Sequence, residues 1–275
     1  MDKLRVEWSS SLSLLRDYVS KLSKSVGLSL KGGLLERYVH ILFTCLCVAY
    51  GRPEFCELVS HNPLLEEPVK IGKAFIESMN RLSKEGLIVS GGSILYATEK
   101  VEVALKTREK KPYVVLCDCL SLPEYVYIYD RFSKSIRLDG LLYSINPGGV
   151  TRTYEYLTST ILKSQEEEMT MPTLGEALKI RFKATGYTVV RGIDELVHKT
   201  QYEKFPSASD MAVSLYRAIE DIAFKISILS EDYTVLVLSD HGYDVSLEPD
   251  GYSLFHMFTG EGACLSLFSA ILVVG

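Results

Sequence analysis

The sequence predicts an α/β fold, in which a mostly parallel sheet is flanked by helices and a mainly helical lobe comes first in the chain. From residue 106 onward, apolar runs alternate with amphipathic segments, which is typical of buried parallel strands covered by helices on both faces. Before residue 106, apolar residues recur at helical spacing between glycines that break the pattern. We therefore expect two domains, a helical lobe of residues 1–105 and an α/β domain of residues 106–275.

The first domain is predicted to contain helices over residues 12–28, 34–50 and 71–85. Residues 86–105 carry β-branched side chains around a Gly-Gly pair, which predicts a hairpin followed by a short strand or helix. A helix that leads into a hairpin is the outline of a DNA-binding winged helix, although the expected recognition helix, 71–85, is only modestly basic. The other interpretation is a structural lobe, or one that binds a protein partner or shields the second domain.

The second domain begins after the charged run 107–111 and is predicted to alternate strands with helices. Strands are expected at residues 112–118, 186–194 and 233–240, and residues 265–275 are a last apolar segment. Helices are expected at residues 153–168, 174–184 and 210–229. In such sheets ligands bind beyond the carboxyl ends of the strands, so the residues that follow these strands are the candidates for a site.

The composition restricts the function only weakly. With 275 residues, of which 47% are hydrophobic and 24% charged, the chain is long enough to bury a core in one large domain or two modest ones. A formal net charge of −5 does not favour nonspecific binding to nucleic acid. The most apolar stretch, residues 39–50, is far shorter than the roughly 20 residues that a membrane span requires, so we expect a cytoplasmic protein.

The six cysteines include no C-x-x-C pair, which fits the same compartment. Cys117 and Cys119 lie on either side of Asp118 in a predicted strand, and we interpret them as small buried residues. Side chains alternate between the two faces of a strand, so both thiols should point away from the face of Asp118. A role as metal ligands is the alternative. His40 and His61, in the helical lobe, are expected to be structural.

Aspartate and histidine residues recur where the predicted strands end. They are Asp118, Asp194, His198, Asp240, His241 and His256. Taken singly, an aspartate after a strand is often a turn former or a helix cap, and the Asp194–His198 pair could be an exposed ion pair. Together, carboxylates and imidazoles suit zinc and manganese, and the four-residue spacing lets Asp194 and His198 chelate one ion from one helix face. We therefore predict two divalent metal ions, Zn²⁺ or Mn²⁺, that could clamp an in-line phosphoryl displacement.

The order of these residues resembles that of the alkaline phosphatase superfamily, and the compact layout is most similar to its PglZ-domain branch. The resemblance covers residues 111–275, and its most specific parts are the S-D-H-G run at residues 239–242 and the Asp-x-x-x-His spacing. It implies an alkaline phosphatase-like core with a threonine nucleophile, Thr151, and a role in defence against phage. The first ion would be held by Asp118, Asp240 and His241. The second ion would be held by Asp194, His198 and His256.

Thr151 follows the Gly-Gly turn of residues 148–149 and begins a predicted helix, whose backbone N–H groups could hold a phosphate. A threonine hydroxyl is unreactive at neutral pH, so it would need metal coordination to become an attacking alkoxide. Arg152 could add a charge-assisted contact to the phosphate. Thr153 is the alternative nucleophile because it lies at the same helix start, and both threonines could instead cap the helix.

The leading hypothesis is therefore a two-metal hydrolase of phosphate esters, with a protein partner bound through residues 1–105 as a further expectation. A phosphodiesterase or nuclease and a phosphomutase are the competitors from the same superfamily, and a phosphomutase should carry a larger cap domain. A non-catalytic interaction module is the alternative from another class. His256, which lies in an aromatic context soon after His241, could also be a packed histidine.

Overall fold

The computed structural model describes residues 2–29, 32–57, 59, 63–84, 92–134, 136–146, 149–163, 169–256 and 265–275. The helices are α1 (Asp2–Ser29), α2 (Leu34–Tyr50), α3 (Pro53–Cys56), α4 (Glu66–Lys84), α5 (Gly92–Leu105), α6 (Leu122–Arg131), α7 (Glu155–Leu162), α8 (Met171–Phe182), α9 (Gly192–Thr200) and α10 (Ala208–Asp232). Short 3₁₀ turns are η1 (Pro63–Leu65), η2 (Thr151–Tyr154) and η3 (Leu265–Leu267). None of these helices is both long and apolar enough to cross a membrane.

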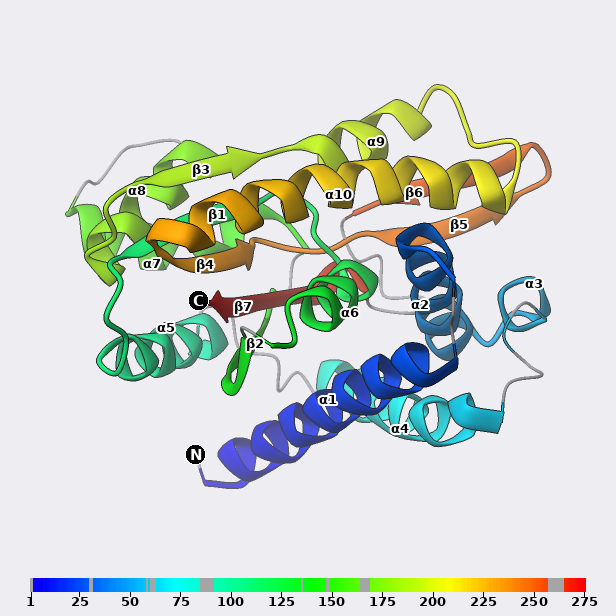
Figure 1. The fold of residues 1–275 in the computed structure, drawn as a ribbon, viewed down its shortest axis with the longest axis horizontal. Helices are drawn as coiled ribbons and strands as arrows, with labels where there is room; N and C mark the ends of the chain where they lie inside the picture. Colours follow the sequence, from blue (N-terminus) through cyan, green and yellow to red (C-terminus); the bar gives the residue numbers. More distant parts are fainter. Residues whose placement is uncertain are drawn as a thin grey trace.

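A mixed sheet lies at the centre of the molecule (Figure 1). Its five strands run in the order β2-β7-β4-β1-β3. They are β1 (Pro112–Cys117), β2 (Ile136–Ile145), β3 (Tyr187–Val190), β4 (Thr234–Ser239) and β7 (Phe268–Val274). β1 is parallel to both β3 and β4, whereas β7 is antiparallel to its neighbours β4 and β2. Every strand except β7 therefore runs in one direction, which confirms an α/β fold with a mostly parallel sheet.

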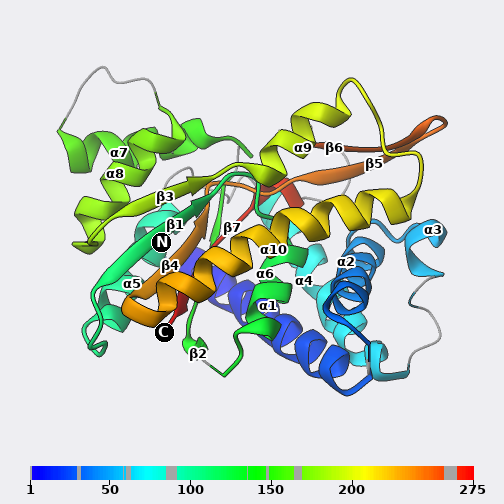
Figure 2. The same cartoon turned by 45° about the horizontal axis from the view of Figure 1, so that its top comes forward.

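Helices cover both faces of the sheet, as the alternation of buried side chains along β1 requires (Figures 1 and 2). Val115 and Cys117 belong to a core that also takes side chains from α1, α2, α4, α6, α9 and α10. Val114 and Leu116 belong to a second core, which takes side chains from α5, α7 and α8. Helices from before residue 106 therefore pack on both sides of the sheet.

The hairpin expected within residues 86–105 is wrong for its described part, because residues 92–105 form helix α5. Ala97 and Val101 are four residues apart and both buried, so they lie on one face of the helix and pack against the sheet. That packing overrides the local preference of β-branched residues for strands. Residues 85–91 lie outside the described residues, as does His61, and the described part of the chain gives no support to a winged helix.

The buried carboxyl of Glu124 joins α2 to the centre of the molecule. It accepts hydrogen bonds from Tyr38 Oη on α2 at 2.6 Å and from Tyr243 Oη at 2.7 Å. Its second oxygen accepts the backbone N–H of Ser121 at 3.2 Å, which completes the capping box at the start of α6. The division at residue 106 stays a prediction, but the two parts share one core and this polar network.

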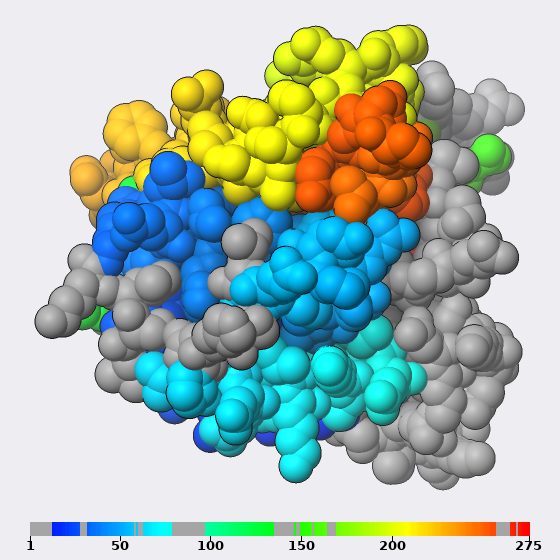
Figure 3. Space-filling view, turned by 90° about the vertical axis from the view of Figure 1, so that its right-hand side faces the viewer, coloured from blue at the N-terminus to red at the C-terminus, as the bar shows by residue number. Residues whose placement is uncertain are grey.

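A short hairpin, β5 (Asp244–Glu248) and β6 (Gly251–Phe255), forms a separate two-stranded sheet. It lies at the surface beside the start of α10 and the segment of α3 (Figure 3). Tyr252 on β6 forms a bridge with Phe205, and its ring lies 6.3 Å from that of Phe55 on α3.

Cys47 and Cys56 form a disulfide between α2 and α3, which the sequence analysis did not predict. Structural disulfides are uncommon in reducing compartments. This pair gives no support to the expected cytoplasmic location, which stays a prediction.

The Glu124 network should make the stability of the protein depend on pH. Burial raises the pKa of the Glu124 carboxyl from 4.5 to about 7, although hydrogen bonds from Tyr38 and Tyr243 lower it. The folded protein therefore holds this proton more tightly than the unfolded chain, and stability falls as pH rises from 4.5 to 7. At about 1.4 kcal/mol per pH unit, the loss amounts to about 3 kcal/mol.

We predict that Glu124→Gln removes this pH-dependent loss, because glutamine carries no proton to release. Urea unfolding between pH 5 and pH 8 measures it. The quantity to compare is the slope of the free energy of unfolding against pH. Its absolute value is not compared, since glutamine places an amide opposite the Ser121 N–H and lowers stability at every pH. An identical slope in wild type and variant would show that Glu124 does not titrate in this range.

Candidate metal centre

Parallel pairing places the ends of β3, β1 and β4 level at one edge of the sheet. Cys117, the last residue of β1, lies opposite both Val190 and Ser239. Asp118 continues the alignment, because its N–H donates to the Val190 carbonyl at 2.9 Å. Asp118 and Asp240 are therefore the first residues beyond two adjacent strands, as the sequence predicted.

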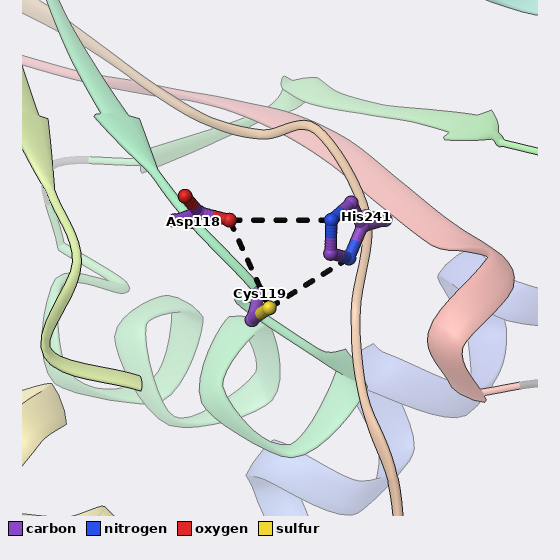
Figure 4. A group of neighbouring side chains, drawn as sticks. All are labelled: Asp118, Cys119 and His241. Atoms are coloured by element: carbon purple, nitrogen blue, oxygen red, sulfur yellow. Dashed lines mark hydrogen bonds and ion pairs between the residues drawn. The ribbon is translucent and has the colours of Figure 1, made fainter. Parts of the chain in front are cut away.

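Cys119 turns the chain away from the sheet with a φ of 64°, an unusual backbone conformation for a residue other than glycine. The turn is held by Leu120, whose N–H donates to Ser239 Oγ at 3.0 Å. Cys119 Sγ consequently lies 3.8 Å from Asp118 Oδ1 (Figure 4). The expectation that this thiol points away from Asp118 is wrong, because β1 ends at Cys117 and strand alternation does not reach Cys119.

The loop that follows β4 is anchored through most of its residues. The Ser239 hydroxyl donates to the His241 carbonyl, and the Gly242 N–H donates to the Ser266 carbonyl at 3.0 Å. The Asp244 carboxylate accepts the N–H groups of Leu265 and Ser266, at 3.0 and 3.3 Å. This loop therefore presents its side chains from a fixed backbone.

Asp240 is fully buried and holds two of the predicted site residues. Its Oδ2 lies 3.2 Å from His241 Nε2 and accepts the Thr151 hydroxyl at 2.6 Å. Its other oxygen, Oδ1, has no hydrogen-bond partner in the part of the chain that the structure describes. A buried carboxylate oxygen normally has a partner, so this one is available to a ligand.

His241 is oriented for coordination through Nε2. Its Nδ1 lies 2.9 Å from the Gly242 carbonyl, which requires the proton to be on Nδ1. Nε2 then faces Asp118 Oδ1 at 4.0 Å and Asp240 Oδ2 at 3.2 Å. A carbonyl that fixes the tautomer in this way is the usual second partner of a metal-bound histidine.

A second group of ligands comes from α9 and the end of the β5–β6 hairpin. Asp194 Oδ1 lies 3.2 Å from His198 Nε2 on α9, as the four-residue spacing predicted. The hairpin returns the chain so that the ring of His256 lies 5.6 Å from that of His198 and 4.9 Å from that of His241. Thr200 holds the hairpin on α9, because its hydroxyl donates to the Leu254 carbonyl at 3.1 Å.

Cys119 connects the two groups, since its Sγ also lies 3.5 Å from Asp194 Oδ1. Two sets of side chains have ligand atoms within 4.8 Å of one another: Asp118, Cys119 and His241; and Cys119, Asp194 and His256. These sets contain four of the six predicted ligands and add Cys119. The other two, Asp240 and His198, each lie 3.2 Å from a member of a set. No pattern in the sequence indicates that this thiol faces the site, because its position depends on one backbone dihedral.

The charges of the cluster favour a cation. Burial, and then the charges of Asp240 and Asp194, raise the pKa of the Asp118 carboxyl to about 7, while His241 and Arg191 act in the opposite direction. Burial and the same three carboxylates hold the pKa of the Cys119 thiol well above its usual range. Burial, with His241 next in effect, lowers the pKa of His256. A bound cation would compensate this concentration of negative charge.

Thr151 is the threonine that contacts the cluster. Thr153 belongs to the same turn, where its N–H donates to the Val150 carbonyl at 3.2 Å. The predicted helix start is a 3₁₀ turn, η2, and α7 begins only at Glu155. The Arg152 side chain is 84% exposed and pairs with Glu155 at 3.6 Å, so it contacts no carboxylate of the cluster.

No protein-family model matches the chain, and no curated protein matches it. The resemblance to the alkaline phosphatase superfamily therefore stays a prediction.

We predict that Gly242→Ala displaces the loop that carries His241. An added Cβ would lie 2.4 Å from the Leu265 carbonyl oxygen and 2.8 Å from Ser121 Oγ. Such overpacking should lower the free energy of unfolding by about 1–3 kcal/mol, which urea denaturation measures. Gly192→Ala is the matched control, because a Cβ there meets Ala218 at an ordinary 3.6 Å. Equal losses in both variants would contradict the close packing around Gly242.

Proposed function

We propose that the protein is a metal-dependent hydrolase of phosphate esters, with two divalent cations at the edge of the sheet and Thr151 as the nucleophile. The observation that carries this proposal is the 2.6 Å hydrogen bond from Thr151 Oγ1 to Asp240 Oδ2, since it joins the hydroxyl to the carboxylates and imidazoles of the cluster. An assignment to the alkaline phosphatase superfamily or its PglZ branch, a role in phage defence and a cytoplasmic location are parts of the proposal that rest on the sequence alone.

The residues present fit a divalent cation. Two carboxylates and two imidazoles have ligand atoms within 4.8 Å of the Cys119 sulfur, and Asp240 and His198 lie 3.2 Å from members of this group. One buried carboxylate oxygen, Asp240 Oδ1, has no partner among the described residues. Oxygen and nitrogen donors suit both zinc and manganese. Asp118, Asp240 and His241 would hold one cation, and Asp194, His198 and His256 the other.

The protein's own groups position the hydroxyl for attack. In the resting arrangement Asp240 Oδ2 accepts a hydrogen bond from the Thr151 hydroxyl. This bond uses the hydroxyl hydrogen, so a lone pair of Oγ1 is available to attack the phosphorus atom. The Asn146 side chain donates to the carbonyls of Asp240 at 2.9 Å and Val150 at 2.7 Å, and so ties the nucleophile's turn to the metal-binding loop. Bound cations would lower the pKa of the hydroxyl and offset charge on the phosphate.

Arg191 is a better candidate than Arg152 for a contact to the phosphate. Arg191 follows β3 at the same sheet edge, is exposed, and favours the ionised form of Asp118 through its charge. Arg152 is paired with Glu155. We therefore assign the charge-assisted phosphate contact to Arg191 in this proposal.

The competing functions differ in the substrate or in the fate of the phosphoryl group. A phosphodiesterase or nuclease would use the same cluster on a diester, and a phosphomutase would return the phosphoryl group to a second hydroxyl. A non-catalytic module would need no reachable nucleophile, whereas Thr151 is only partly buried. A protein partner could bind through residues 1–105 in any of these cases.

The protein should bind two divalent cations per chain, and Asp240→Ala should lose at least one of them because it removes a buried ligand. Elemental analysis after dialysis against zinc or manganese measures the stoichiometry. Asp210→Ala, at an exposed position in the first turn of α10, is the control for loss of a carboxylate alone. A folded wild-type chain that binds neither metal would rule out the centre.

Thr151→Ala should abolish hydrolysis of generic phosphate monoesters and diesters and leave metal content unchanged, since the principal ligands remain. Thr153→Ala should have a milder effect because the structure gives it no contact with the cluster's carboxylates. Acid quenching followed by mass spectrometry should locate a phosphoryl group on Thr151. Full activity in both variants would instead indicate a metal-activated water as the attacking group.

A further inference from the structure

Cys119 lies where the ligands of the two cations meet. Its Sγ is 3.8 Å from Asp118 Oδ1, 3.5 Å from Asp194 Oδ1 and 3.7 Å from His241 Nδ1. The side chain is buried, and the surrounding chain is fixed by the hydrogen bonds of Asp118 and Leu120 to the neighbouring strands. The backbone that carries the thiol is therefore fixed by the neighbouring strand ends.

Hydrogen bonding alone does not account for this arrangement. A thiol has one weak donor proton, and it faces two carboxylate oxygens here. His241 Nδ1 already has the Gly242 carbonyl as its partner. One of the carboxylates is thus left without a donor from the sulfur.

The distance from Sγ to each carboxylate oxygen is that expected between two ligands of one ion. A tetrahedral zinc holds sulfur at about 2.3 Å and oxygen at about 2.0 Å, which places the two donors roughly 3.5 Å apart. The distances from Sγ to the two carboxylates, 3.5 and 3.8 Å, match this value to within a few tenths of an ångström.

A second observation points to a ligand at the same place. Asp240 is completely buried beside His241, and its Oδ1 has no hydrogen-bond partner within the described ranges. Its charge acts on the Cys119 thiol, so the two groups belong to one cluster.

We propose that Cys119 is a thiolate ligand of this centre and that it makes the centre select zinc over manganese. This inference rests on the metal centre of the proposed function. The thiol would release its proton to solvent when the cation binds. The thiolate would contact the cation that lies nearer Asp194, because Sγ is 3.5 Å from Asp194 Oδ1 in the structure. Thiolates favour zinc, whereas manganese favours oxygen donors, so the sulfur decides between the two metals.

The test uses the full chain, stripped of metal and kept reduced with a phosphine, which does not compete as a thiol ligand. Loaded with Co²⁺, it should show a near-ultraviolet thiolate-to-cobalt charge-transfer band. Cys119→Ser and Cys119→Ala should lose the band and bind zinc at least about tenfold more weakly, with a smaller change for manganese. Cys117→Ala is the matched control, since Cys117 is equally buried two residues earlier, at the end of β1, but belongs to neither set of candidate ligand atoms.

A measurement on wild type alone keeps the test independent of how the variants fold. Zinc-edge X-ray absorption should show a sulfur neighbour at about 2.3 Å. Bound metal without the band or the sulfur neighbour overturns the role of Cys119 and leaves the proposed hydrolase intact. A band that persists in both Cys119 variants also overturns it. A folded wild-type chain that binds no metal overturns both proposals.

Discussion

The parallel pairing of β1 with both β3 and β4 is the constraint on which the candidate centre depends. It sets Cys117 opposite Val190 on one side and Ser239 on the other, so three strands end level. The segments that follow the three strands therefore lie side by side. Asp118 and Cys119 follow β1, α9 follows β3, and Asp240 and His241 follow β4. A shift of two residues in either pairing would keep every side chain on its face and still separate Asp118 from its partners by several ångströms.

The sequence predicted where the strands end better than it predicted how the side chains beyond those ends are arranged. Apolar runs that end in aspartate located the ends of β1 and β4, because buried strands leave a clear signal. The Asp194–His198 pair followed from helical spacing alone. The position of Cys119 could not be predicted, because its left-handed conformation is set by hydrogen bonds to two other strands. Tertiary packing also turned residues 92–105 into a helix where β-branched residues favoured strands.

The N-terminal helices are more closely joined to the rest of the chain than their sequence pattern indicates. Tyr38 and Tyr50 lie near opposite ends of α2, and their hydroxyls reach Glu124 and Asp244. The first contact ends on α6, where Glu124 also accepts a hydrogen bond from Tyr243, and the second ends on Asp244 at the start of β5. Polar contacts between distant parts of a chain have no periodicity, which is why sequence patterns favoured a separate lobe. These two hydrogen bonds connect α2 to α6 and to the strand that follows the loop carrying Asp240 and His241.

The β5–β6 hairpin sets the separation of His241 and His256 at its open end, where Asp244 pairs with Phe255. The tip lies at the other end of the ladder, beyond the pair Glu248 and Gly251. The number of residues between the two histidines is therefore not a measure of the distance between them. Residues inserted at the tip would lengthen the hairpin and leave both imidazoles in place. The same scaffold could in this way acquire a longer arm at the surface while the spacing of the two histidines stays unchanged.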